Sequence, residues 1–170
     1  MVVDIGGGTT EIAVISLGGV VVSRSLRIAG DEMNEDIVRY ARDAFNLLIG
    51  EKTAEEVKIS IGSAYTLREP MTYPIRGRDL VSGLPKEIIA TDEQIREALS
   101  HSIRIIVNNI KTIIEETPPE LLSDIFQRGI ILAGGGSLIR GLDRLLANQT
   151  GIPVRMMEDP LTAVVRGTGV

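Results

Sequence analysis

The stretch Val2-Val3-Asp4-Ile5-Gly6-Gly7-Gly8-Thr9-Thr10-Glu11 decides how this sequence is interpreted. A short apolar run ends in an aspartate and an isoleucine, three glycines follow, and two threonines lead into a second apolar run, Ile12–Ile15. This order predicts a strand, a tight turn and a second strand. Because glycine has no Cβ, the turn can adopt φ > 0 and its N–H groups can close around an oxyanion. Asp4 would then place a carboxylate at the mouth of the turn, where Mg²⁺ or its water could sit if the anion were a nucleotide phosphate.

A glycine triplet taken alone has a simpler explanation, a hairpin whose loop merely needs glycine. Length and composition restrict the number of domains, the kinds of site and the partners that this chain can have. The 170 residues, 44% of them hydrophobic, predict one globular domain with room for a small inserted subdomain. The absence of Cys excludes disulfides and thiolate metal sites, and a single His argues against a His-rich metal site or a Ser-His-Asp triad. The net charge of −5, with basic and acidic residues interspersed, predicts no nucleic-acid partner.

The hydrophobic periodicity predicts a mixture of strands and helices. Three strands joined by short glycine turns are expected at residues 2–5, 12–15 and 20–28, followed much later by a strand at 130–133 that is covered on both faces. Amphipathic helices are expected from a cap at Asp31 to Leu48, at 51–62 with a cap at Thr53, from a capping box at Thr91 and Gln94 to Ile114, from Pro119 to Phe126, from Leu138 to Asn148 and at Leu161–Val165. Shorter β-like pieces are expected at Met71–Arg76, Lys86–Ala90 and Pro153–Met156.

A second glycine run, Gly134-Gly135-Gly136-Ser137, lies between the apolar strand at 130–133 and the helix expected at Leu138. A strand, a glycine turn and a helix N-terminus together offer backbone N–H groups and a positive dipole end to an anion, or let a flat base lie against bare backbone. The run matches neither the dinucleotide-binding pattern nor the P-loop pattern. Glu55 and Glu56 have two interpretations. They complement a helix dipole, or one of them accepts hydrogen bonds from ribose hydroxyls.

Two glycine loops at opposite ends of one fold resemble the actin-like ATPase superfamily. Residues 4–11 resemble its second phosphate loop, residues 132–137 its adenosine motif and residues 159–167 its second connecting helix. Within the superfamily, the segments 28–33, 49–55 and 116–121 resemble the MreB bacterial actins. The resemblance spans nearly the whole chain and is weakest across residues 63–91.

This resemblance implies an α/β fold, the second lobe of an actin-like ATPase. A ribonuclease-H-like core, with a mixed sheet flanked by helices, would comprise residues 1–62 and 92–170, and residues 63–91 would form a small inserted α+β subdomain. The resemblance also implies that the chain is half a molecule. The other lobe would carry the first phosphate loop, the residue that positions the attacking water and the segment that touches lipid.

The resemblance also assigns site residues, position by position. Gly6, Gly7 and Gly8, with Thr9 beside them, would approach the β- and γ-phosphates of ATP or ADP. Asp4 would hold Mg²⁺ through its hydration shell, and Thr10 and Glu11 would lie near the γ-phosphate and the attacking water. Gly134, Gly135, Gly136 and Ser137 would border the adenine and ribose, with Glu55 and Glu56 on the ribose side.

The function implied is that of an ATP-binding, filament-forming bacterial actin that directs cell shape and cell-wall synthesis. It would act in the cytoplasm at the inner face of the cell membrane. Its partners would be further copies of itself, the cell-wall elongation machinery with its membrane proteins, and the membrane through the other lobe. We expect the chain alone to self-associate and not to hydrolyse ATP. The alternatives within the superfamily are a sugar or acetate kinase and a chaperone-type ATPase.

Overall fold

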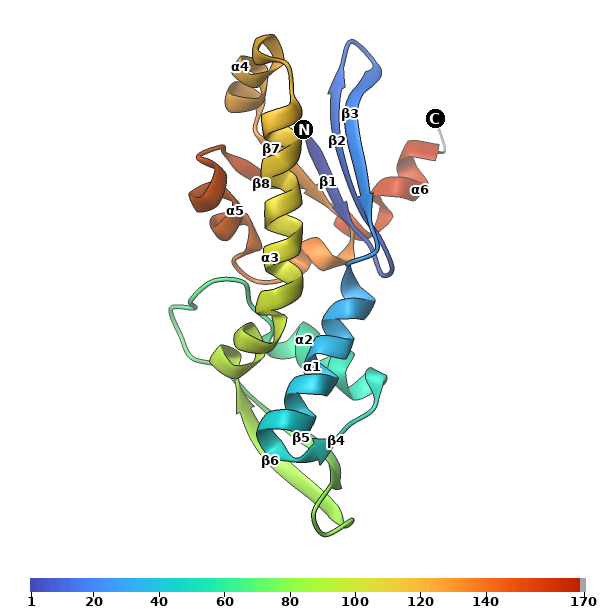
Figure 1. Cartoon of the computed structure of the whole chain (residues 1–170), viewed down its shortest axis with the longest axis vertical. Coiled ribbons are helices and arrows are strands. Elements are labelled where there is room, and N and C mark those ends of the chain that lie inside the picture. The colour runs from blue at the N-terminus through green and yellow to red at the C-terminus, as the bar shows by residue number, and fades with distance from the viewer. Residues whose placement is uncertain (169–170) are drawn as a thin grey trace. The chain divides into compact units, whose positions relative to one another are not determined.

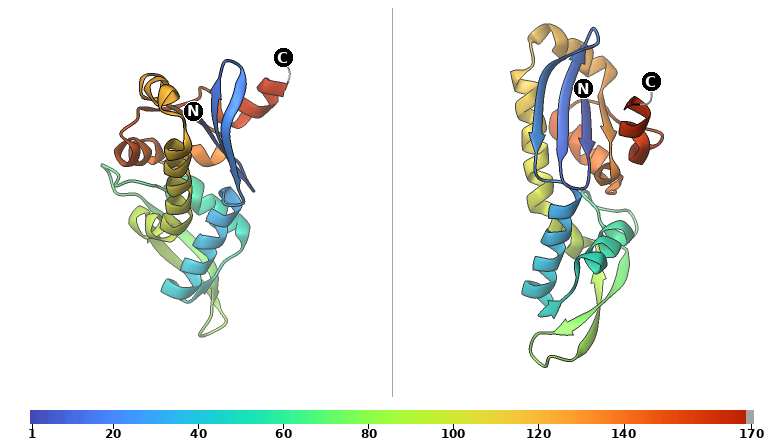
Figure 2. Two further views of the ribbon diagram at one scale, coloured as in Figure 1. Left: turned by 45° about the horizontal axis from the view of Figure 1, so that its top comes forward. Right: turned by 90° about the vertical axis from the view of Figure 1, so that its right-hand side faces the viewer.

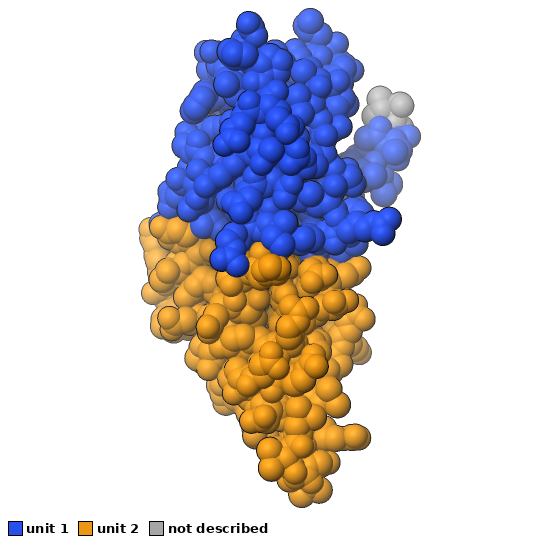
Figure 3. Space-filling view, viewed as in Figure 1, with its two compact units in different colours: residues 1–30, 104–138, 142–170 blue, residues 31–103, 139–141 orange. Residues whose placement is uncertain are grey.

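The structure is a computed structural model that describes residues 1–168, and it divides into two compact units (Figure 3). Unit 1 comprises residues 1–30, 104–138 and 142–170, and unit 2 comprises residues 31–103 and 139–141. The domain boundaries expected at residues 62 and 91 stay a prediction. Among the described residues, no helix combines the length and the apolar composition that crossing a membrane requires.

Unit 1 contains a mixed sheet of five strands in the order β3-β2-β1-β7-β8 (Figure 1). The strands β1, β2 and β3 form the predicted antiparallel meander, whereas β7 runs parallel to both β1 and β8. The bounds are Val2–Ile5 for β1, Thr10–Ser16 for β2, Gly19–Leu26 for β3, Ile130–Ala133 for β7 and Val154–Met156 for β8.

Alternation along the strands of unit 1 explains which face is covered. Val3 and Ile5 of β1 and Ile12 of β2 are fully buried, while the residues between them point to the other face. In β7, Ile130 and Leu132 are buried but Ile131 is 38% exposed. The prediction that this strand is covered on both faces is therefore wrong at Ile131.

The helices of unit 1 flank its sheet, as predicted. The long helix α3 (Asp92–Glu116) lies along one face of the sheet with its second half, where Ile106, Ile110 and Ile113 are buried (Figures 1 and 2). The remaining helical elements are α4 at Pro119–Arg128, the 3₁₀ turn η1 at Gly135–Leu138, α5 at Leu142–Thr150, the 3₁₀ turn η2 at Pro160–Thr162 and α6 at Ala163–Thr168.

Unit 2 has its own small core. Its three-stranded antiparallel sheet has the order β4-β5-β6 and contains the two β-like pieces expected near residues 71–90. The elements are α1 at Gly30–Phe45, β4 at Leu47–Leu48, α2 at Glu51–Ile61, β5 at Thr72–Asp79, β6 at Pro85–Thr91 and the first half of α3. The apolar stripes of the three helices supply the buried residues Met33, Ile37, Val57, Ile61, Ile95 and Leu99.

Two helix boundaries differ from the predicted ones. Helix α1 begins at Gly30, so Asp31 lies inside its first turn, and it ends at Phe45 instead of Leu48. Asn46 adopts a left-handed conformation (φ 50°), which asparagine tolerates better than most residues, and its carbonyl accepts a hydrogen bond from the Leu80 N–H (2.8 Å). The following leucines therefore pair with β5 as strand β4.

The helix predicted at Leu138–Asn148 begins at Leu142. In unit 2, the segment 139–141 pairs with Ser63 through Arg140, and the Ala64 N–H donates to the Arg140 carbonyl (2.8 Å). Gly141 then has φ +74°, which ends the extended segment just before α5. Long-range pairing of this kind leaves no trace in local periodicity.

The other two predicted helix caps, at Thr53 and Thr91, have different outcomes. The Thr91 Oγ1 accepts from the Gln94 N–H (3.3 Å) and the Gln94 Oε1 accepts from the Thr91 N–H (3.0 Å), which confirms the capping box of α3. Helix α2 starts two residues before Thr53, at a Gly50 cap without a side-chain hydrogen bond, so the Thr53 cap is wrong.

The capping box can be tested by comparing two threonine substitutions. Thr91→Ala removes one of the two reciprocal hydrogen bonds and should lower the free energy of unfolding by about 1 kcal/mol. Thr53→Ala removes no cap and should change it by less than about 0.5 kcal/mol. Urea unfolding followed by circular dichroism measures both, and equal losses would contradict the assignment.

Candidate nucleotide site

The first glycine loop is a tight connection between β1 and β2. Ile5 pairs with Thr10, so the connection consists of Gly6–Thr9, and the Gly6 N–H donates to the Thr9 carbonyl (2.9 Å) across it. Gly7 and Gly8 are exposed, and their N–H groups donate to no backbone acceptor in the described chain. The strand–turn–strand prediction is confirmed, and two N–H donors at the tip of the loop are available to an anion.

Two carboxylates lie on the same sheet face next to this loop. Asp4 of β1 and Glu11 of β2 are direct cross-strand partners, and the Ser25 hydroxyl donates to Glu11 Oε1 (2.6 Å). Burial, and then the negative charge of Glu11, raise the pKa of Asp4. Neither carboxylate forms a salt bridge with a cation in residues 1–168. Because like charges placed opposite each other destabilise a sheet, a bound cation would relieve this repulsion.

The second glycine loop lies against the end of β1. Ala133 is the parallel partner of Asp4, and Gly134 follows with φ +79°. A Cβ on Gly134 would overlap Asp4 Oδ1 and the Ile5 carbonyl, and a Cβ on Gly136 would overlap the Ile5 side chain. The fold therefore brings both glycine loops to the end of one strand, with the Asp4 carboxylate against the second loop. Only glycine allows this approach.

Hydrogen bonds hold the second loop in place. The Gly134 N–H donates to the Pro160 carbonyl (2.9 Å), and the buried Ser137 hydroxyl donates to the Gly134 carbonyl (2.7 Å). Sequence reasoning missed the role of Pro160, which no local pattern could reveal because the contact joins distant segments. It also predicted a helix N-terminus directly after this loop. That prediction is wrong, because the loop continues into the single 3₁₀ turn η1 and offers no helix dipole.

Thr9 and Thr10 lie in different environments. Thr9 is exposed beside Gly8, whereas Thr10 is fully buried and its hydroxyl donates to the Ile28 carbonyl (2.7 Å). The predicted role of Thr10 near a γ-phosphate stays a prediction. Its burial could have been foreseen, because Thr10 shares the strand face of Ile12 and Val14.

Glu55 and Glu56 belong to unit 2, whereas both glycine loops belong to unit 1. Both glutamates are exposed in the second turn of α2. Nearby, burial lowers the pKa of Lys58, and Glu55 is the foremost acidic neighbour opposing that shift. That Glu55 and Glu56 lie on the ribose side of a bound nucleotide stays a prediction.

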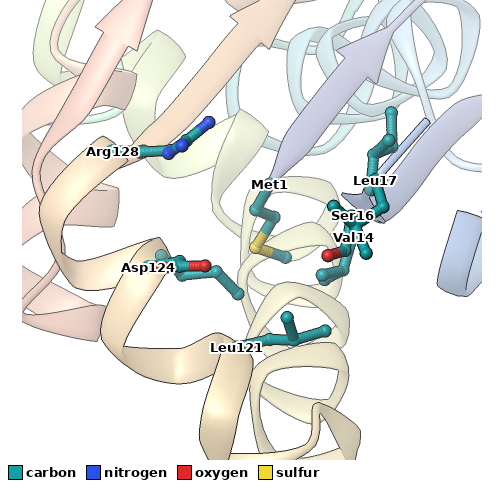
Figure 4. Close-up of a pocket in the computed structure, with 9 residues that line it drawn as sticks. Met1, Val14, Ser16, Leu17, Leu121, Asp124 and Arg128 are labelled. Atoms are coloured by element: carbon teal, nitrogen blue, oxygen red, sulfur yellow. The ribbon is translucent and has the colours of Figure 1, made fainter. Parts of the chain in front are cut away.

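A separate pocket of about 330 Å³ lies in unit 1, away from the residues of both glycine loops (Figure 4). Leu121 and Asp124 of α4 face Leu17 across it, with the Met1 side chain between them. Its full lining is Met1, Val14, Ile15, Ser16, Leu17, Leu121, Asp124, Ile125 and Arg128. None of these was predicted as a site residue.

The mixed sheet, its flanking helices and the two glycine loops that meet at the end of β1 define one half of an actin-like ATPase fold. Comparison with solved structures agrees. MreB5 of Spiroplasma citri bound to AMPPNP superposes with a TM-score of 0.95 at 43% identity, covering 99% of this chain and 50% of that one. The double helical filament of MamK superposes with a TM-score of 0.77 at 27% identity, covering 94% and 49%.

The chain belongs to the MreB/Mbl family, whose model matches residues 1–170. The cell shape-determining protein MreB of Escherichia coli is 53% identical over 169 residues, which cover 99% of this chain and 49% of that protein. The cell shape-determining protein Mbl of Bacillus subtilis is 48% identical over 170 residues, covering 100% and 51%. The chain thus spans about half the length of the curated relatives it matches. The match favours the bacterial actins over the kinases and chaperone-type ATPases that the sequence had left open.

The close approach of the second loop to β1 predicts a large cost for Gly134→Ala. The substitution combines a left-handed backbone with overlap against Asp4 and Ile5, and should lower the free energy of unfolding by about 2–4 kcal/mol. Gly18 has the same φ of +79° but open space around it, so Gly18→Ala should cost only about 1–2 kcal/mol. Denaturant unfolding gives the difference, and equal costs would show that packing against β1 is unimportant.

The raised pKa of Asp4 predicts how stability depends on pH. Folding favours the protonated carboxyl, so its contribution is greatest below the ordinary value of 3.8 and is lost as the pH rises through the folded-state pKa. Without Mg²⁺, Asp4→Asn should therefore be more stable than the wild type at pH 7, and the advantage should shrink at acid pH. Glu11→Gln should act in the same direction but less, because it removes only the second cause. Urea unfolding in EDTA at pH 7 and at acid pH measures the free energy of unfolding of the three proteins. An Asp4→Asn variant that is less stable than the wild type at pH 7 would contradict this account.

Proposed function

We propose that the chain binds ATP or ADP with Mg²⁺ at the two glycine loops, as the second lobe of a filament-forming bacterial actin. The observation that carries the proposal is the meeting of both loops with the Asp4 carboxylate at the end of β1. The structures of MreB5 bound to AMPPNP and to ADP, both at 43% identity, support it.

The donor set fits such a ligand. The free N–H groups of Gly7 and Gly8 suit phosphate oxygens, and the exposed Thr9 hydroxyl lies beside them. Asp4 would hold the hydration shell of Mg²⁺, and Glu11 would orient a water molecule near the loop. Residues 1–168 contain no cluster of three or more acidic, His or Cys side chains able to hold a metal alone. This agrees with Mg²⁺, which takes one or two carboxylates and completes its shell with water and phosphate.

The other assignments follow from the second loop and from unit 2. Gly134 and Gly135, only half-buried and without side chains, would lie against the base, while the buried Ser137 keeps the loop in shape. Glu55 and Glu56 would accept hydrogen bonds from the ribose. When bound, Mg²⁺ would neutralise charge on the phosphates of ATP and favour transfer of the γ-phosphoryl group to water, with ADP as the leaving group.

At the level of the cell, we propose a filament that directs cell shape and wall synthesis at the inner face of the membrane. The MamK double helical filament, at 27% identity, supports assembly with further copies of the same protein. Partners in wall synthesis and the membrane would be engaged by the whole protein. Since this chain spans about half the length of its relatives, hydrolysis of ATP would require the other half of the protein as well.

A nucleotide titration tests the proposal. Fluorescent ADP in Mg²⁺ should bind the wild-type protein, and Asp4→Asn should weaken binding at least about tenfold, because the hydration shell of the metal loses its anionic partner. In EDTA, the difference between the two proteins should largely disappear. The titration is carried out twice, once on this chain alone and once on a full-length protein that contains it.

The matched control is Asp143→Asn, which removes an exposed carboxylate from the first turn of α5 in the same unit. It should leave the affinity unchanged. If neither the wild-type chain nor the wild-type full-length protein binds ADP, the proposed function is overturned. Equal weakening by both variants would refute the role of Asp4.

A further inference from the structure

The first glycine loop is bound to the segment that leads into α1. The Thr10 hydroxyl, fully buried, donates to the Ile28 carbonyl (2.7 Å), and the Gly30 N–H donates to the Gly6 carbonyl (3.0 Å). One bond involves Gly6 at the start of the loop and the other involves Thr10 directly after it. Both join the loop to residues 28–30. Ala29, between the two contacts, is buried, so water does not readily compete for them.

This segment has a particular place in the chain. Gly30 is both the first residue of α1 and the last residue of the first segment of unit 1, so the chain passes from unit 1 into unit 2 here. The backbone of Gly6 is fully engaged, because its N–H donates to Thr9 and its carbonyl accepts from Gly30. The loop is therefore hydrogen-bonded directly to the first residue of α1.

We propose that Thr10 is a positioning residue that couples the phosphate-binding loop to the start of α1. The inference rests on the proposed function, because it assumes that the ligand of the loop is the nucleotide phosphate. Thr10 touches no ligand in this account. Its hydroxyl fixes the loop against Ile28 and Gly30, so that occupation of the loop alters the freedom of the first turn of α1. By linkage, a restriction of the first turn of α1 alters the affinity of the loop to the same extent.

Amide hydrogen exchange followed by NMR, without ligand, tests the coupling first. Thr10→Val keeps the shape of the side chain and removes the donor. It should accelerate exchange of the Gly6 and Gly30 amides by roughly tenfold, the order expected for one lost hydrogen bond. Thr10→Ser keeps the hydroxyl and should restore slow exchange. The Gly129 amide, which donates to Ile125 elsewhere in unit 1 (2.7 Å), should be unchanged in both variants.

The matched control is Thr117→Val. Thr117 is also buried, and its hydroxyl also donates to a backbone carbonyl, that of Ile113 (2.6 Å), in the same unit. The Thr117→Val variant should lose about as much global stability as Thr10→Val. Under native conditions, however, its Gly6 and Gly30 amides should stay protected from exchange. Acceleration at these amides in Thr117→Val, or none in Thr10→Val, would overturn the inference.

The second measurement adds ADP and Mg²⁺. In the wild type, the ligand should slow exchange at Gly30, and in Thr10→Val this response should fall while affinity drops several-fold. If the wild type and Thr10→Val both bind ADP and show equal responses at Gly30, the coupling alone is refuted. A wild type that binds no ADP would refute the proposed function, while the ligand-free exchange would still decide the role of Thr10.

Discussion

The close approach of two backbone segments at the end of β1 is the constraint on which the candidate site depends. Gly134 and Gly136 lie so near Ile5 that a side chain at either position would overlap it. Strand β7 can therefore pair in parallel with β1 and still turn away immediately beyond it. The result is that one loop with free N–H groups and one loop of bare backbone share a strand end. Asp4 is the side chain that lies at this junction.

Asp4 and Glu11 place two like charges next to each other within the candidate site. Two like charges are cross-strand neighbours, and no cation of the described residues pairs with either. Some carboxylates elsewhere in the molecule are paired, as Asp92 is with Arg96 (3.2 Å) and Asp79 with Lys86 (3.1 Å). If the first glycine loop binds an anion as proposed, an unpaired carboxylate pair beside it is the arrangement expected where the balancing positive charge comes with the ligand.

Much of this fold could be predicted from the sequence because its signals are local. Alternation located β1 and β2, the Thr91 capping box located the start of α3, and the glycine runs located both loops. The errors in the end of α1 and in the start of α5 came from long-range contacts. Asn46 ends α1 because the following residues pair with β5, and Arg140 delays α5 because its segment pairs with Ser63. For the candidate site, the sequence predicted roles for the glycines and Asp4, and the structure brings these residues together at the end of β1. The sequence could not show that Gly134 rests on Asp4, that Pro160 holds Gly134, or that the Thr10 hydroxyl faces Ile28.

The most direct test of the central claim is an NMR titration of the ¹⁵N-labelled chain with ADP and Mg²⁺. If the two glycine loops form one nucleotide site, the largest chemical-shift changes will occur together at Gly6–Thr9 and Gly134–Gly136, with one common dissociation constant. Changes confined to one loop, changes centred on the pocket around Leu121, or different dissociation constants for the two loops would contradict the account.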